Sequence, residues 1–100
     1  MPNITELATK LDALGHPLRL KIIATLSSNE MYLNEIANKV GVSRALAKIH
    51  LKKLEKAGIV KSRIETAEGE AKALRYYKLL PFDIRVSPQT LKQEVEKNGQ

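Results

Sequence analysis

VSRALAKIHLKKLEKAG, residues 42–58, is the stretch that decides the fold of this chain, because it marks both ends of a helix. Ser43 is a good N-cap, since its hydroxyl can accept a hydrogen bond from a backbone N–H group that the first helical turn leaves unpaired. Gly58 suits the left-handed position just after a helix, where a side chain would clash. The sequence therefore predicts a helix over residues 43–57.

The two faces of this predicted helix differ in character. One face is an apolar stripe at the i, i+3, i+4 and i+7 positions, formed by Ala47, His50, Leu51 and Leu54. Cations recur every four residues along its flank, at Arg44, Lys48, Lys52 and Lys56. We expect the helix to pack on a core with the first face and to present positive charge with the other.

The net positive charge of the chain is concentrated in this helix and the segment after it. Residues 43–63 hold seven Lys or Arg against a single acid, Glu55, whereas the whole chain has 17 Lys or Arg and 11 acids. The net charge is +6 for residues 43–63 and +6 for the whole chain, so the rest of the chain has no net charge. Such concentration indicates an anionic partner, and a solvated charged helix that binds nothing is the structural alternative.

Length and composition predict one small globular domain over residues 1–100. Apolar residues make up 43% and charged residues 28%, and the chain contains no cysteine for a disulfide or a thiolate metal site. No run approaches the roughly 20 apolar residues that cross a bilayer, and the N-terminus lacks the pattern of a signal peptide. We expect a cytoplasmic protein without a membrane partner, and the pI near 9.7 favours nucleic acid.

Three further helices are predicted before the basic one. Apolar residues at helical spacing indicate a helix over 4–14, and Pro17 is suited to the first position of the next, over 17–28. In that helix Ile22 and its apolar neighbours are expected to point inward, with Arg19 and Lys21 outward. After a brief strand at 31–33, Asn34 is a plausible cap for a third helix. A turn at 41–43 then leads into the basic helix, which is the helix-turn-helix pattern.

The period changes after Gly58. Residues 59–64 and 72–80 have strand propensity and flank a turn at 66–70, so we predict a hairpin. Tyr76 and Tyr77 would point to opposite faces of the second strand, so that at most one lies in the core. A helix-turn-helix followed directly by a hairpin is the winged-helix arrangement. The predicted fold class is mainly α with a small β-hairpin, a winged helix-turn-helix.

The C-terminal part suggests association between two copies of the chain. Residues 82–86 alternate apolar and charged residues and predict an extended segment, and Ser87-Pro88 begins a helix over about 88–97. The apolar stripe of this helix is too thin to hold it within the core of one monomer. We expect a homodimer in which residues 1–14 and 82–98 form the interface. The candidate interface residues are Leu7, Leu11, Leu91 and Val95.

Several motifs resemble those of the ArsR (SmtB/ArsR) family of winged-helix transcriptional regulators, in a compact form similar to archaeal members. The resemblance covers roughly residues 7–80 and is carried by LGHPLRLKII at 14–23, LNEIA at 33–37, residues 42–60 and RYYKL at 75–79. It implies a dimer whose basic helix enters the major groove of DNA while the hairpin wing reaches the flanking backbone. Such proteins are often repressors released by a ligand.

The chain departs from the metal sensors of that family. Their paired cysteines, in an E-L-C-V-C-D-L run, align with residues 30–36, where Tyr32 and Asn34 stand in place of the two cysteines. In the last helix Glu94 and Glu96 lack the histidine partners of the family's interface site. We therefore expect no metal and no cofactor.

The predicted contacts with double-stranded DNA divide into base-reading and phosphate-binding groups. Arg44 and Lys48 lie near the N-terminus of the basic helix, the end that contacts bases, and Arg44 can fork onto guanine. Ile49 either touches a thymine methyl group or lies at the edge of the core. Glu68 and Glu70 at the wing tip predict a weak wing contact, and Lys56 is expected to be solvated. The candidate DNA-binding residues are Ser43, Arg44, Ala45, Lys48, Ile49, Lys52, Lys53, Lys61, Arg63, Lys72 and Arg75.

No catalytic constellation is recognisable in the sequence. His50 is expected to be a packed, hydrogen-bonded residue of the core stripe and His16 a capping or exposed residue, and neither has a nucleophile at a catalytic spacing. We interpret the protein as a sequence-specific, homodimeric transcriptional regulator and not as an enzyme. The alternatives are a weakly specific chromatin-type protein and a winged helix that binds another protein. An RNA-binding role is disfavoured, because an aromatic stacking platform is missing.

Overall fold

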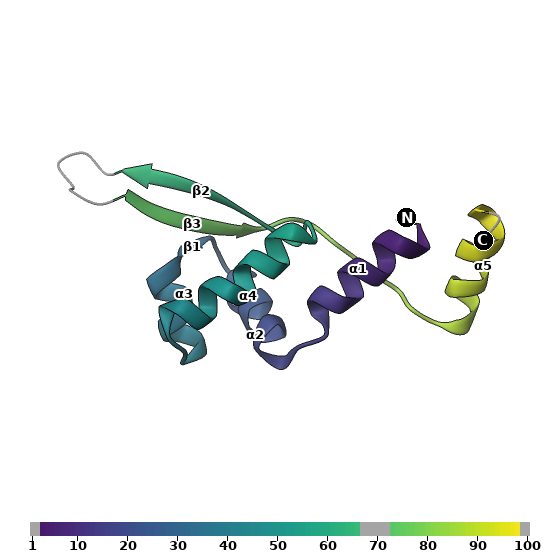
Figure 1. Ribbon diagram of the computed structural model, residues 1–100, viewed down its shortest axis with the longest axis horizontal. Helices are drawn as coiled ribbons and strands as arrows, with labels where there is room; N and C mark the ends of the chain where they lie inside the picture. Colours follow the sequence, from purple (N-terminus) through teal and green to yellow (C-terminus); the bar gives the residue numbers. More distant parts are fainter. Residues whose placement is uncertain (1–2, 67–72, 99–100) are drawn as a thin grey trace.

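The computed structural model describes residues 3–66 and 73–98. The helices are α1 (Ile4–Leu14), α2 (Pro17–Leu26), α3 (Leu33–Val40), α4 (Arg44–Lys56) and α5 (Pro88–Asn98), and the strands are β1 (Met31–Tyr32), β2 (Val60–Thr66) and β3 (Ala73–Leu79) (Figure 1). This arrangement confirms the predicted winged helix-turn-helix. The sheet has three strands in the order β1-β3-β2, since β1 adds to the predicted hairpin.

Local sequence signals set the ends of α4 and α2. The Ser43 hydroxyl accepts a hydrogen bond from the Leu46 N–H at 3.1 Å, as expected of an N-cap. Gly58 has a φ of 76°, so a side chain there would strain the backbone. Pro17 occupies the first position of α2, and Nδ1 of His16 accepts from the Leu18 N–H at 3.0 Å. The predicted boundaries of α4 and the capping role of His16 are confirmed.

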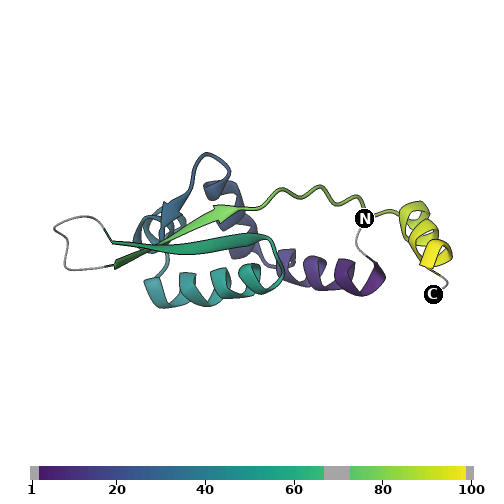
Figure 2. The same ribbon diagram turned by 90° about the horizontal axis from the view of Figure 1, so that it is seen from above.

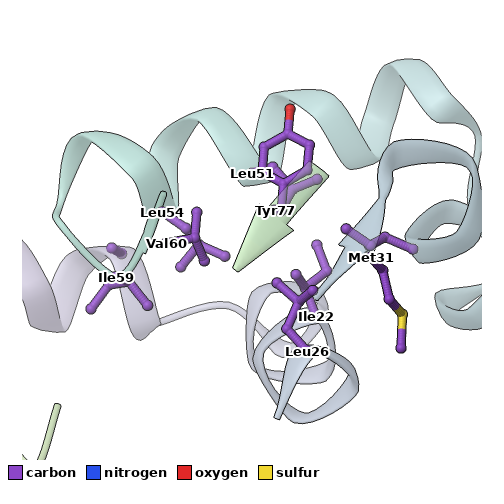
Figure 3. Close-up of a cluster of buried hydrophobic side chains, with 10 residues drawn as sticks. Ile22, Leu26, Met31, Leu51, Leu54, Ile59, Val60 and Tyr77 are labelled. Carbon is purple, nitrogen blue, oxygen red and sulfur yellow. The ribbon is translucent and has the colours of Figure 1, made fainter. Parts of the chain in front are cut away.

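The core lies between α2, α3, α4 and the base of the sheet (Figure 3). Ala47, Leu51 and Leu54 are each 0% exposed, which confirms the predicted apolar stripe of α4. Tyr77 is buried against this stripe while Tyr76 is half-buried on the other face of β3, as the alternation predicted. Burial of this face fixes how far α4 can rotate about its axis and hence which side chains it presents outward.

The wing is a two-stranded antiparallel ribbon. β2 and β3 are paired from Val60 with Leu79 out to Thr66 with Ala73, and β1 pairs Met31 with Tyr77. β2 is longer than predicted and includes Thr66, which was expected to begin the turn. The rest of the predicted turn, with Glu68, Glu70 and Lys72, lies outside the described residues.

Three local predictions were wrong. α2 ends at Leu26 and not at 28. Asn34 is the second residue of α3 and not its cap; Tyr32 is the N-cap, and the Glu35 carboxylate accepts a hydrogen bond from its N–H at 3.2 Å. Arg19 was expected to point outward but is only 8% exposed, because its guanidinium binds groups inside the fold.

The molecule is elongated, with a radius of gyration of 16.1 Å and extents of 56 × 25 × 21 Å. The wing and α5 lie at opposite ends of the long axis (Figure 2). Residues 80–87 carry the chain from β3 past α1 to α5 and form no strand. The extended segment predicted at 82–86 is therefore a connection that places α5 beside α1, away from the core.

Candidate nucleic-acid interface

The N-terminal half of α4 presents a mixed basic and apolar surface. Arg44, Ala45, Lys48 and Ile49 are all exposed there, on the side opposite the buried stripe. Ile49 is 64% exposed, so it does not lie at the edge of the core. Ser43 precedes this surface, and its hydroxyl is already engaged as the N-cap. The helix thus offers cations and apolar groups side by side, two kinds of side chain that can contact base edges.

Lys53, which we predicted to contact DNA, is held by an acid of α1. Its Nζ lies 2.9 Å from Oδ2 of Asp12, and both side chains are exposed to solvent. The bond to Lys53 lowers the pKa of Asp12. The pair links α4 to α1 and directs the lysine away from the N-terminal half of α4. Lys52 and Lys56 have no acidic partner among the described residues.

Arg63, a predicted wing contact, is also occupied. Its guanidinium makes two hydrogen bonds to the Glu30 carboxylate, at 2.8 and 2.7 Å, and binds Glu65 as well. The guanidinium carbon lies 5.1 Å from the centre of the Tyr76 ring. These carboxylates raise the pKa of Arg63, and Arg63 in turn lowers the pKa of Glu30. The charge of Arg63 is therefore balanced by Glu65 of β2 and by Glu30, which directly precedes β1.

Arg75 is positioned by a relay of hydrogen bonds from α4. The Ser62 hydroxyl donates to the Glu55 carboxylate at 2.8 Å, and the Arg75 guanidinium donates to the same hydroxyl at 3.0 Å. Arg75 and Lys61 have no ion pair within the part of the chain that the structure describes. Arg75 lines two adjoining hollows with Arg44, Lys48 and Lys52, and we call the positive surface of these four cations the α4–wing surface. Lys61 lies on the opposite face of the wing, beside Arg63 and Lys78.

A buried cation behind α4 fixes the helix against α1 and α2. Arg19 donates from Nε to the Ala13 carbonyl at 2.6 Å, from a terminal nitrogen to the Asp12 carbonyl at 3.2 Å, and it bonds Nδ1 of His50 at 3.0 Å. The rings of His50 and His16 lie 4.6 Å apart. Burial, followed by the charges of His16 and Arg19, lowers the pKa of His50. The predicted hydrogen bonding of His50 is confirmed, and the residue is half-buried beside the apolar stripe of α4.

The inward position of Arg19 is signalled in the sequence, although we predicted the opposite. Arg19 precedes Ile22, Ile23 and Leu26 by three, four and seven residues, so it lies on the inward stripe of α2. Its charge led us to place it outside. The long side chain can run along the core and carry its charge to backbone carbonyls.

The predicted interface residues gather at the α1–α5 end of the molecule. Leu7 is buried within the chain and Leu91 is half-buried, whereas Leu11 and Val95 remain 37% and 36% exposed. Glu94 is buried at 6% exposure on the same helix as Val95. One chain therefore leaves part of the apolar surface of α1 and α5 uncovered.

Two features are absent from the described residues, 3–66 and 73–98. No group of three or more His, Cys, Asp or Glu side chains is placed to hold a metal ion. No helix among them combines the length and the apolar character needed to cross a membrane.

Comparison with known proteins gives consistent matches. Residues 16–62 match the model of a family described as bacterial regulatory protein, arsR family. An uncharacterized HTH-type transcriptional regulator of Methanocaldococcus jannaschii is 33% identical over 85 residues, which cover 85% of this chain and 87% of the relative. The biofilm growth-associated repressor of Xylella fastidiosa is 33% identical over 58 residues, 58% of this chain and 51% of the relative.

The fold has been seen before in a solved structure. The homodimeric winged helix-turn-helix DNA-binding domain of a possible ArsR-family regulator from Mycobacterium bovis superposes with a TM-score of 0.68. The superposition covers 96% of this chain and 78% of that one at 21% sequence identity.

Proposed function

This chain belongs to the ArsR family of regulatory proteins, and from that membership and the α4–wing surface we propose that it binds specific sites in double-stranded DNA as a homodimeric transcriptional regulator. The family is one of regulators and not a class of enzymes. Since such a protein acts on the chromosome, we place it in the cytoplasm. The relative in Xylella fastidiosa is described as a repressor, which favours repression as the effect of binding.

The observation that carries the proposal is the division of α4 into two faces. One face is fully buried, so the other must point outward, and it presents Arg44, Ala45, Lys48 and Ile49 at its N-terminal end. A helix with its side chains is about 10–12 Å across and fits a major groove about 12 Å wide. In this position Arg44 and Lys48 reach base edges while Lys52 lies nearer a phosphate.

We propose that the wing contributes a modest backbone contact. Arg63 is neutralised by Glu30 and Glu65, whereas Lys61, Arg75 and Lys78 have no ion-pair partner among the described residues and remain able to meet phosphates. Lys53 likewise contributes less than Lys48, because Asp12 holds it. Tyr32 and Asn34 supply a phenol and an amide where the metal sensors need thiolates, so we propose no metal-sensing role for them.

We propose that the chain is one domain over residues 1–100, with residues 1–14 and 82–98 forming the dimer interface. The exposed apolar residues of α1 and α5 and the homodimeric state of the Mycobacterium bovis domain support this assignment. A two-fold dimer would place its two α4 helices in half-sites about one helical turn apart.

The test is a selection of genomic DNA fragments, followed by binding of the best fragment and a scrambled fragment across a salt series. We expect an inverted repeat to be bound at least about a thousandfold more tightly than scrambled DNA. Equal and steeply salt-dependent binding of both fragments would favour the chromatin-type alternative. Binding of neither fragment would favour a winged helix that binds a protein.

Two substitutions test the proposed division of labour on α4. Arg44→Ala should weaken binding of the selected site by roughly 1–3 kcal/mol and relax its sequence preference, because the bidentate base contact is lost. Lys52→Ala should weaken selected and scrambled DNA alike and flatten the salt dependence by about one phosphate contact. Equal losses on both DNAs for both variants would refute the assignment.

A further inference from the structure

A small polar pocket lies where α3, α4 and β3 meet. It has a volume of about 170 Å³ and is lined by Asn34, Arg44, Lys48, Arg75 and Tyr77 among others. A second hollow of about 270 Å³ continues it along α4 and shares Lys48, Arg75 and Tyr77 with it. Three side chains thus line both hollows, and two of these are cations.

The hydroxyl of Tyr77 is the unusual group in this pocket. Tyr77 is only 3% exposed and its ring belongs to the core, yet its hydroxyl points toward α4 (Figure 3). The hydroxyl has no hydrogen-bond partner within residues 3–66 and 73–98. Among the described residues, the fully enclosed side-chain atom without a partner is Oδ1 of Asn34 and not the Tyr77 hydroxyl. The Tyr77 hydroxyl is therefore reachable from the pocket. A buried tyrosine normally satisfies its hydroxyl, so this donor is available to a ligand in the pocket.

The surroundings of Tyr77 select an anion with acceptor oxygens. Burial raises the pKa of Tyr77, so its hydroxyl is protonated at neutral pH and can donate. Lys48 and Arg75 line the pocket together with Tyr77, and the Ser62 hydroxyl accepts a hydrogen bond from the Arg75 guanidinium at 3.0 Å. Glu55 is the one acid lining the second hollow, and its carboxylate is engaged by Ser62 at 2.8 Å.

The position of Asn34 favours the same kind of ligand. Asn34 is the second residue of α3, so the pocket lies beside the N-terminal turn of that helix. The helix dipole favours negative charge there, although the Glu35 carboxylate already accepts from the Tyr32 N–H. The volume is several times the roughly 30 Å³ that a water molecule occupies, which leaves room for a phosphate group.

We propose that this pocket receives one phosphate group of the DNA backbone, with the Tyr77 hydroxyl donating to a phosphate oxygen while Lys48 and Arg75 balance its charge. The inference rests on the proposed function, because a helix seated in the major groove brings a flanking strand between α4 and the wing. It adds a neutral donor, Tyr77, to the cations of the α4–wing surface. The ring anchors this donor in the core, so the phosphate would set the register of the whole domain on the duplex.

The test compares Tyr77→Phe with Tyr76→Phe, a matched control on the opposite face of β3. Binding of a random-sequence duplex is measured by fluorescence anisotropy across a salt series. We expect Tyr77→Phe to weaken binding about tenfold at every salt concentration, since a hydrogen bond to a charged group is lost. The slope against salt should stay unchanged, because no cation is removed. Tyr76→Phe should bind as the wild type does.

A second pair of variants tests the pocket independently, in case Tyr77→Phe does not fold. Asn34→Asp places a carboxylate at the pocket, whereas Asn38→Asp makes the same charge change one turn farther along α3, at an exposed residue outside the pocket lining. Asn34→Asp should weaken binding about tenfold more than Asn38→Asp does. Equal losses for the two variants would overturn the proposal.

The remaining outcomes separate this proposal from the proposed function. If the wild type binds DNA and Tyr77→Phe binds equally well, the proposed phosphate site is wrong and the DNA-binding function stands. If the wild type binds no duplex, both fall. Titration of inorganic phosphate, followed by the NMR signal of labelled Tyr77, distinguishes a free anion from the backbone. A shift with free phosphate, together with unchanged DNA binding by Tyr77→Phe, would overturn the assignment to DNA.

Discussion

Arg19 shows how a single buried cation can organise three helices without a carboxylate partner. Its guanidinium donates to the carbonyls of Asp12 and Ala13, which lie in the last turn of α1. Carbonyls in that turn have no partner within the helix, and the negative end of the helix dipole favours a cation there. The third contact, to His50, extends the same side chain to α4. Arg19 thus caps the C-terminal end of α1 and fixes the position of α4.

Removal of the Arg19 guanidinium should destabilise the fold. We expect Arg19→Met to lower the free energy of unfolding by roughly 1–3 kcal/mol, because the Ala13 carbonyl is left buried without a donor. Urea denaturation measures the difference. Lys21→Met is the control, since Lys21 is an exposed cation of the same helix and should change stability by less than about 0.5 kcal/mol. A comparable loss in both variants would contradict this role.

His50 should make stability fall in mildly acidic solution. The lowered pKa of His50 in the fold means that the unfolded chain binds a proton more readily. The stability that neutral His50 provides is complete above the unfolded value of about 6.5 and is lost as the pH falls through the lower folded value. A proton on Nδ1 would also abolish the acceptor for Arg19 and place two positive charges side by side.

The measurement is the thermal midpoint between pH 7.5 and 5, for the wild type and for His50→Gln. The glutamine side chain would keep an acceptor near Arg19 but does not titrate, so the wild type should lose stability over this range and the variant should lose less. A parallel decline in the two proteins would show that other groups cause it. An NMR titration of His50 gives the direction of its pKa shift independently.

At the scale of single residues, the sequence predicted positions better than partners. The burial of Ala47, Leu51 and Leu54 follows from helical period, and each is buried. The partner of Arg63 does not follow from any period, because Glu30 lies 33 residues earlier and meets it only after β1 joins the sheet. The ion pair of Lys53 with Asp12 also joins residues that are far apart in the sequence, so no period predicts it. Charges can be counted from a sequence, whereas their pairing depends on tertiary structure.

At the scale of elements, α4 combines a stable start with an exposed basic surface. The Ser43 cap lies directly before the residues that we assign to base contacts. A cap that frays would let Arg44 and its neighbours move, so we expect cap stability and DNA affinity to be coupled in the wild type. An acidic cap would separate them, because aspartate also caps helices but repels phosphates.

Two substitutions at Ser43 should therefore act in opposite ways. Ser43→Ala should lower the free energy of unfolding by about 1 kcal/mol, since the Leu46 N–H loses its acceptor. Ser43→Asp should keep stability within about 0.5 kcal/mol of the wild type and weaken DNA binding more than Ser43→Ala does. Thermal denaturation and DNA titration of each variant measure the two effects. If the alanine variant is the poorer DNA binder, the cap matters to binding more than charge does.

The element boundaries show which local signals are strong. Ser43, Pro17 and Gly58 marked their elements correctly because each acts through its own backbone geometry or a bond within one turn. Asn34 misled the prediction, since a good capping residue also fits the first turn of α3 when another residue takes the cap. The short strand β1 needed β3 to complete it, so its role as a third strand could not be read from residues 31–33 alone.

At the scale of the whole molecule, the elongated shape of the single chain is consistent with the proposed dimer. A compact chain of 100 residues has a radius of gyration of about 13 Å, whereas this one has 16.1 Å. The excess comes from the projecting wing and from α5, which touches α1 beyond the end of the core (Figure 1). A helix held by so little of its own chain gains most from a partner surface.

Val95→Asp should convert the dimer into a monomer, because it places a charge on the part of α5 that one chain leaves exposed at 36%. Sedimentation equilibrium at micromolar protein should give twice the chain mass for the wild type and the single mass for the variant. Leu20→Asp, on an exposed apolar residue of α2, is the control and should remain dimeric. Loss of simultaneous contact with two half-sites should lower affinity for the selected site by a factor of about 10²–10⁴. A wild type that is monomeric, yet binds that site tightly, would instead show that one domain suffices.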